Sequence, residues 1–98
     1  MSDTIPSEDA RPPWTVPDFS RVSDVMLYDI ARDTATVLQS IQLNRQRAAA
    51  NEAEREYWVA RGWLVRQQIK ALSVDDRAGM IAQEGAWDDE ARGLRTKG

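Results

Sequence analysis

Residues 18–50 read DFSRVSDVMLYDIARDTATVLQSIQLNRQRAAA, and neither Gly nor Pro occurs between Asp18 and Gly62. The apolar residues of this stretch recur with the 3.6-residue period of an α-helix, which predicts an amphipathic helix facing a core. Pro17 followed by Asp18 or Ser20 is typical of a helix start, because Asp and Ser are favoured N-cap residues. The predicted stripe follows Phe19, Val22, Met26, Ile30, Val37 and Ile41, and Leu27, Ala31 and Leu38 widen it.

The length of this predicted helix conflicts with the size of the chain. A continuous helix over residues 18–50 would be about 50 Å long, whereas a compact chain of 98 residues has a radius of gyration of about 13 Å. We therefore expect a break between Asn44 and Glu52, or a protruding end that packs on another subunit. Asp33 and Asn44 fall on the stripe, where polar groups often fix the register of a helical assembly. They are candidate register-setting residues.

Two more helices are predicted after residue 50. Residues 51–56 either continue the first helix or form the first turn of a second helix capped by Asn51. The second helix runs to about Leu72 and carries a wide apolar face. Ser73 and Asp76 are spaced as in a capping box, which predicts the start of a short third helix. We expect residues 88–98 to form a charged, flexible tail. The apolar face of the second helix comprises Tyr57, Trp58, Leu64, Val65, Ile69 and Leu72.

All four prolines, Pro6, Pro12, Pro13 and Pro17, lie within residues 1–17. Proline disfavours the interior of helices and sheets, so this segment is predicted to be an extended or disordered arm. Trp14 within it either folds back onto the helices of its own chain or docks on another chain. The resulting fold class is all-α, a small helical hairpin or three-helix arrangement over residues 18–87 with a Pro-rich N-terminal arm.

The amino-acid composition excludes several classes of catalytic site. The chain has no Cys and no His, which removes thiolate and imidazole chemistry, so we predict no catalytic residue, metal site or cofactor. The net charge is −3 and the longest apolar runs are too short for a membrane helix. We expect a cytoplasmic protein, or one within a virion if the gene is from a phage, because Arg, Ala and Asp usage suggests a bacterial, plasmid or phage genome.

Charge is unevenly distributed along the chain, and its basic middle coincides with an unusual helix face. Residues 1–40 hold seven acids and three bases, residues 41–72 three acids and six bases, and residues 73–98 six acids and four bases. In the second helix Val59 and Trp63 lie one turn apart, opposite the predicted apolar face, beside Arg66 and Lys70. Trp and Arg dominate interface hot spots, so these four residues with Trp14 are the predicted partner-binding set.

Three interpretations of this face remain open. Trp63 is covered by Trp14 or by the third helix, it anchors a protein partner, or it stacks on nucleic acid while Arg45, Arg47, Arg66 and Lys70 contact phosphates. Because so few helices bury a thin core, we expect a homo-oligomer or a subunit of a larger complex. The sequence favours a non-enzymatic adaptor, assembly subunit or inhibitor that acts by protein contact, with accessory nucleic-acid binding as the alternative.

Overall fold

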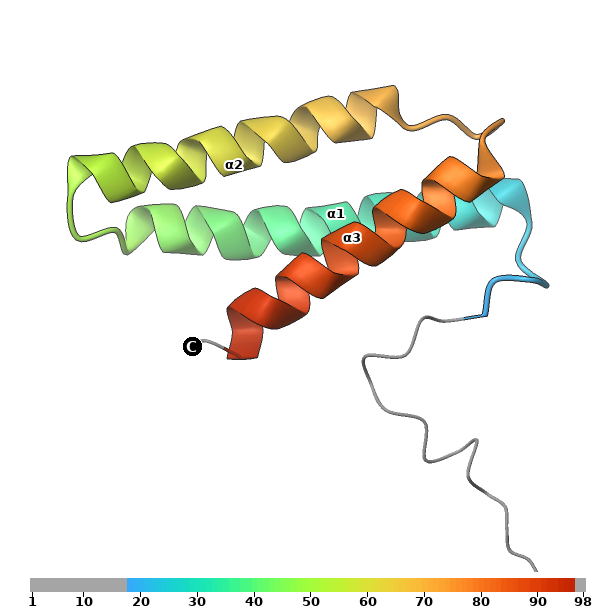
Figure 1. The fold of residues 1–98 in the computed structure, drawn as a ribbon, viewed down its shortest axis with the longest axis horizontal. Helices are drawn as coiled ribbons and strands as arrows, with labels where there is room; N and C mark the ends of the chain where they lie inside the picture. The colour runs from blue at the N-terminus through green and yellow to red at the C-terminus, as the bar shows by residue number, and fades with distance from the viewer. Residues whose placement is uncertain (1–17, 97–98) are drawn as a thin grey trace, which may run out of the picture.

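The computed structural model describes residues 18–96, and this part of the chain consists of three helices without a strand. They are α1 (Asp24–Arg47), α2 (Glu52–Ala71) and α3 (Arg77–Thr96). α1 and α2 form an antiparallel hairpin, and α3 runs back obliquely along α1 and diverges from α2 (Figure 1). The all-α prediction is confirmed. The predicted arm, residues 1–17, lies outside the described residues, and none of the described helices is long and apolar enough to cross a membrane.

The length conflict is resolved by a break after Arg47. Ala48 ends α1, and Asn51 begins α2 by accepting a hydrogen bond from the Glu54 backbone N–H at 2.9 Å. The Glu54 carboxylate in turn accepts from the Ala50 backbone N–H at 3.1 Å. These reciprocal bonds satisfy backbone donors at the start of α2 that would otherwise face water, so Asn51 is the cap that the sequence predicts.

Two other predicted helix starts are wrong. α1 is capped by Ser23, whose hydroxyl accepts from the Met26 backbone N–H at 3.1 Å, while Asp18 accepts from the Ser20 backbone N–H and shapes the preceding turn. The start of α3 is set by Asp76, which accepts from the Gly79 backbone N–H at 3.0 Å. Ser73 instead accepts from the Asp75 backbone N–H. In both cases the chain first makes a turn around the predicted cap and begins its helix later.

The third helix is also longer than the sequence indicates. It spans 20 residues and continues to Thr96, so most of the predicted tail at 88–98 is helical. Trp87 and Ala91 are buried against α1, and Arg92 pairs with Asp88 one turn earlier at 2.8 Å. Packing of this face stabilises the helix beyond the point where its glycines and charges suggest fraying.

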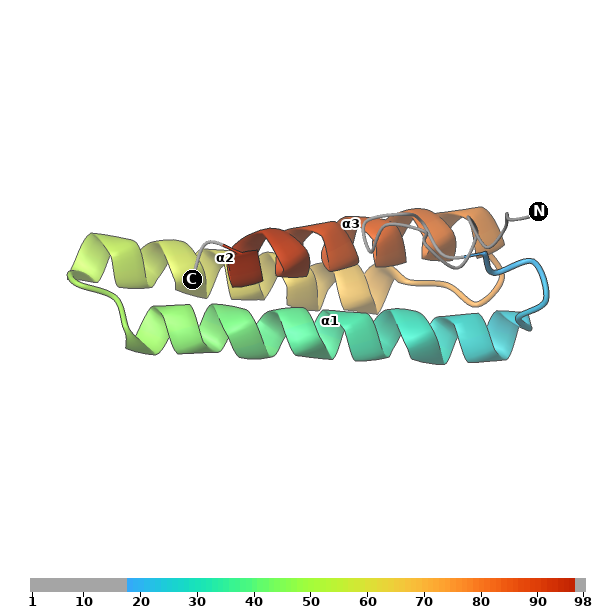
Figure 2. The same cartoon turned by 90° about the horizontal axis from the view of Figure 1, so that it is seen from below.

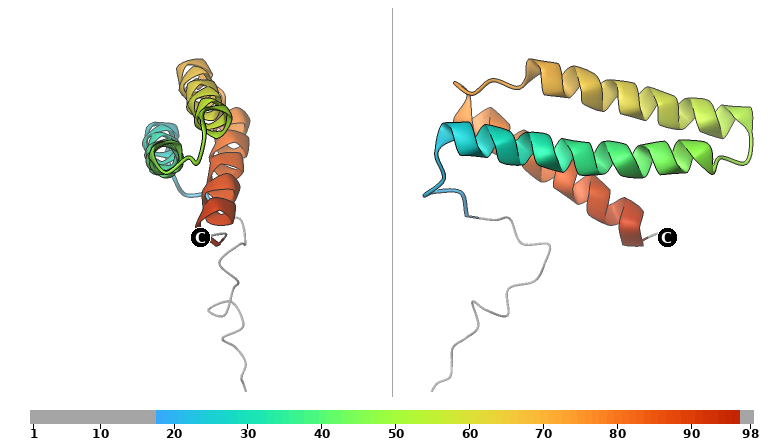
Figure 3. Two further views of the ribbon diagram at one scale, coloured as in Figure 1. Left: turned by 90° about the vertical axis from the view of Figure 1, so that its left-hand side faces the viewer. Right: turned by 180° about the vertical axis from the view of Figure 1, so that it is seen from behind.

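The core lies along α1, which contacts both other helices (Figures 2 and 3). The backbones of α2 and α3 each lie close to that of α1, whereas α2 and α3 meet through side chains: Trp87 Nε1 of α3 donates to Gln68 of α2 at 2.9 Å. The small side chains of Ala31 and Ala35 let Trp87 approach α1 closely. The predicted apolar line is therefore displaced: Met26 and Val37 are 57% and 40% exposed. The buried line of α1 is Leu27, Ala31, Ala35, Leu38 and Gln42.

Candidate partner-binding surface on α2

A polar connection holds the three helices in register beside α2. Gln42 of α1 is 2% exposed and donates through Nε2 to Glu90 of α3 at 3.2 Å. Arg61 of α2 donates to the other Glu90 oxygen at 2.7 Å, and this hydrogen bond raises the pKa of Arg61 above its ordinary value. Charge-assisted bonds of this kind are the stronger ones in proteins. Arg61 therefore fixes how α2 rotates about its axis, and with it where Trp63 points.

α2 is poorly covered by the rest of the chain. Val65 is its one buried residue, although the helix carries two Trp, a Tyr and several aliphatic side chains. On one flank Tyr57 is 57% exposed and Leu64 41% exposed. On the other flank Val59 is 43% and Trp63 56% exposed. Apolar residues thus occupy both sides of the stripe that packs on α1, as is typical of a helix buried in an assembly.

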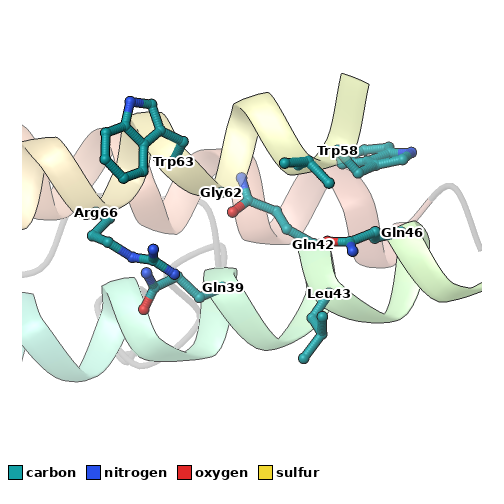
Figure 4. Close-up of a pocket in the computed structure, with 9 residues that line it drawn as sticks. Gln39, Gln42, Leu43, Gln46, Trp58, Gly62, Trp63 and Arg66 are labelled. Carbon is teal, nitrogen blue, oxygen red and sulfur yellow. The ribbon is translucent and has the colours of Figure 1, made fainter. Parts of the chain in front are cut away.

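A groove runs between α1 and α2 on the flank that α3 leaves open. Its volume is about 280 Å³. The Arg66 guanidinium lies over the Trp63 ring, 5.8 Å from its centroid, at one end of this groove. The Gln42 side chain points from α1 towards Gly62 of α2, whereas the Trp63 ring points away from α1 (Figure 4). The lining residues are Gln39, Gln42, Leu43 and Gln46 from α1, with Trp58, Val59, Gly62, Trp63 and Arg66 from α2.

Gly62 opens the floor of this groove rather than admitting a close neighbour. A Cβ built there meets a single side-chain atom, Gln42 Oε1, at 4.0 Å, which is an ordinary van der Waals distance. Among the described residues no backbone or aromatic ring therefore packs tightly against Gly62. Gln42 Oε1 is itself buried and makes no hydrogen bond with the part of the chain that the structure describes.

The structure brings three of the predicted partner-binding residues together. Val59, Trp63 and Arg66 line one groove, and Lys70 lies exposed one turn beyond Arg66. α3 packs on a different side of the hairpin and leaves Trp63 exposed. Trp14 lies outside the described residues, so its contact with Trp63 stays a prediction.

Asp33 and Asn44 are placed differently from the sequence expectation. Both are exposed on α1, away from the line that packs within this chain. The polar residues that do occupy the packing line are Gln42 and Glu84, which are 2% and 5% exposed. Sequence reasoning missed both because their partners lie 48 and 50 residues away along the chain. A role for Asp33 and Asn44 in an assembly stays a prediction.

The four basic residues of the nucleic-acid alternative do not form one patch. Arg45 is half-buried, donates to the Leu94 carbonyl at 2.5 Å and lies over the Trp58 ring. It therefore anchors the end of α3. Arg47 lies at the turn between α1 and α2. Lys70 lies near the other end of α2, about 27 Å from the first residue of that helix. Arg66 and Lys70 alone share a face.

Comparison with known proteins gives no assignment: no family model, curated protein or solved structure matches the chain. Among residues 18–96, no group of three or more acidic side chains is placed to hold a metal ion.

Proposed function

We propose that this protein is non-enzymatic and acts by protein–protein contact through the outward face of α2, as an adaptor, assembly subunit or inhibitor within a larger complex. The observation that carries the proposal is the exposure of Tyr57, Val59, Trp63 and Leu64 on a helix with one buried residue. A Trp side chain has about 150–250 Å² of surface, so Trp63 leaves about 100 Å² in water. Burying that area would contribute about 2–3 kcal/mol to binding.

The surroundings of Trp63 support an interface. The ring has Val59 one turn away, a groove beside it and the Arg66 guanidinium over it, so apolar area is surrounded by polar groups. Interfaces commonly combine such an aromatic centre with a polar rim. Arg61 and Gln42 support the helix from behind through Glu90, so the surface is held in place before a partner arrives.

Site-specific photo-crosslinking in the source cell tests this proposal. A photoreactive residue at Val59 is expected to give a defined protein adduct, whereas the same residue at Ala82, exposed on α3, gives none. Trp63→Ala should remove the adduct, and Val37→Ala, which trims an exposed aliphatic side chain on α1, should not. Equal labelling at Val59 and Ala82, or an adduct insensitive to Trp63→Ala, would contradict the proposal.

A further inference from the structure

One line of exposed residues follows the outward face of α2 from end to end. Successive members are spaced by four, three, four, three and four residues, which is the 3.5-residue period of a coiled-coil seam. The acids come first, the apolar pair is central and the bases come last. We name this line the α2 stripe: Glu52, Glu56, Val59, Trp63, Arg66 and Lys70, all of them exposed.

The α2 stripe is complementary to itself when two copies are placed antiparallel. With the two-fold axis at the level of residue 61, Val59 faces the partner's Trp63 and Trp63 faces the partner's Val59. In the same register Glu56 faces the partner's Arg66, and Glu52 faces the partner's Lys70. Each of the six residues, which span about 27 Å of helix, thus faces a residue of complementary chemistry on the partner. In a parallel pair the same residues would place like charges together, which is unfavourable.

We infer that two copies of this chain pair through their α2 stripes as an antiparallel, two-fold dimer. The inference rests on the proposed function, which it deepens by naming a second copy as a partner. The closed symmetry is that of most homodimers, in which both subunits use the same surface. The groove adjoins Val59, so it offers an apolar recess for the partner's Trp63 at the centre of the interface.

Interactions already made by the stripe oppose pairing only weakly. Glu52 pairs with Arg55, and this hydrogen bond lowers the pKa of Glu52 below its ordinary value, but both side chains are exposed. Exposed pairs of this kind contribute little to stability, so exchange of Glu52 to the partner's Lys70 costs little. The Arg66 guanidinium has further N–H donors beyond its contact with the Trp63 ring.

Charge reversal on the purified full chain tests the register. Sedimentation equilibrium from about 1 µM to about 1 mM should show a monomer–dimer equilibrium for the natural chain. Glu56→Arg or Arg66→Glu alone creates two like-charge contacts per dimer and should raise the dissociation constant at least about tenfold. Mixing the two variants in equal amounts should restore dimers, because each then faces the opposite charge. Glu56→Arg combined with Arg66→Glu in one chain should restore them too.

Arg95→Glu is the matched control, since Arg95 is exposed at the end of α3 and off the stripe. Circular dichroism confirms that each variant keeps its helices. A natural chain that stays monomeric, variants that dimerise as the natural chain does, or a mixture without rescue would each overturn the inference. If self-association fails while the Val59 crosslinker still captures a different protein, the dimer is wrong and the proposed function stands. If the chain does not self-associate and the Val59 crosslinker gives no adduct, both the dimer and the proposed function are wrong.

Discussion

Replacing Glu84 tests how the α1–α3 interface is held. Glu84 is 5% exposed, and its Oε2 lies 2.9 Å from the Thr34 hydroxyl, which is also 3.1 Å from the Ile30 carbonyl. A hydroxyl has one proton, and the carbonyl can only accept. An ionised Glu84 therefore leaves one of the two contacts without a proton, whereas a protonated Glu84 donates to Thr34 while Thr34 donates to Ile30.

The electrostatic surroundings of Glu84 agree with this proton count. Burial raises the pKa of Glu84 above its ordinary value near 4.5, which the hydrogen bond with Thr34 partly opposes. Asp88 and Asp89 raise the pKa further, and Arg92, which pairs with Asp88, lowers it. Glu84 Oε1 is buried and finds no partner among residues 18–96. A buried carboxylate oxygen without a donor is costlier when the group is ionised, because the oxygen then carries charge, so the ionised form destabilises the fold.

We expect Glu84→Gln to increase the free energy of unfolding at neutral pH by about 1 kcal/mol, since the amide keeps the shape, donates to Thr34 and carries no charge. In a domain of this size about 1 kcal/mol corresponds to a rise in Tm of about 4–8 °C. Because the folded pKa is raised, natural-chain stability is lost as pH rises from near 4.5 through the folded pKa. The difference in stability between the Glu84→Gln chain and the natural chain should therefore grow as the pH rises from near 4.5 through the folded pKa, and it should vanish at lower pH.

Thermal and urea unfolding at a series of pH values measure this difference. Asp89→Asn is the matched control, because it removes a charge from the exposed neighbour on the same helix and should shift stability by less than about 0.5 kcal/mol. A Glu84→Gln chain that is less stable at neutral pH, or that is stabilised equally at neutral pH and below the ordinary pKa of Glu, would show that ionised Glu84 does not destabilise the interface.

Three further substitutions have defined outcomes. Gly62→Ala should raise the free energy of unfolding by about 0.5–1 kcal/mol, because the helix loses a flexible residue and the Cβ has room; a lower Tm would show that the floor of the groove is tighter than 4.0 Å. Asn51→Ala should lower urea stability by about 1 kcal/mol through loss of the Glu54 cap, whereas Asn51→Asp retains it; equal losses would argue against capping. Trp63→Ala should weaken association in sedimentation while leaving Tm nearly unchanged, and a large fall in Tm with unchanged association would place Trp63 in the core.

Much of the fold follows from local sequence signals. The Gly-free and Pro-free run predicts α1, and Asn51 predicts the start of α2. The excess length of the first helix predicts either a break or a protruding end, and the structure shows the break. These signals succeed because each depends on neighbours within one turn of helix. The placement of Val59 and Trp63 on one exposed side of α2 also follows from helical spacing alone.

Other features depend on contacts that the local sequence does not contain. The buried line of α1 follows the side on which Leu27, Ala31 and Leu38 widen the predicted stripe, and it includes Ala35, which carries little hydrophobic signal but is small enough to admit Trp87. α3 continues to Thr96 because that packing outweighs the glycines within it. The Gln42–Glu90–Arg61 connection joins three helices, so none of its members is recognisable before the helices are placed.

The α2 stripe is predictable from the sequence only in part. Glu52 and Glu56 read as an acidic helix start, and Arg66 and Lys70 as part of a basic segment. Their relation as one self-complementary line becomes visible once α2 has defined ends and a defined buried side. Helix boundaries and orientation were the missing information, not residue identity.

Disulfide trapping tests the antiparallel pairing of the α2 stripes, since the chain has no cysteine of its own. Chains carrying Glu56→Cys and Arg66→Cys are mixed under mild oxidation. A disulfide requires Cα atoms within about 7 Å, and in the inferred register Cys at position 56 faces Cys at position 66 of the other chain. Two copies of position 56 are then about 15 Å apart along the helices. We expect a crosslinked dimer from the mixture and none from either variant alone. Crosslinking of Glu56→Cys with itself, or no crosslinking of the mixture, would show that the stripes do not pair in this register.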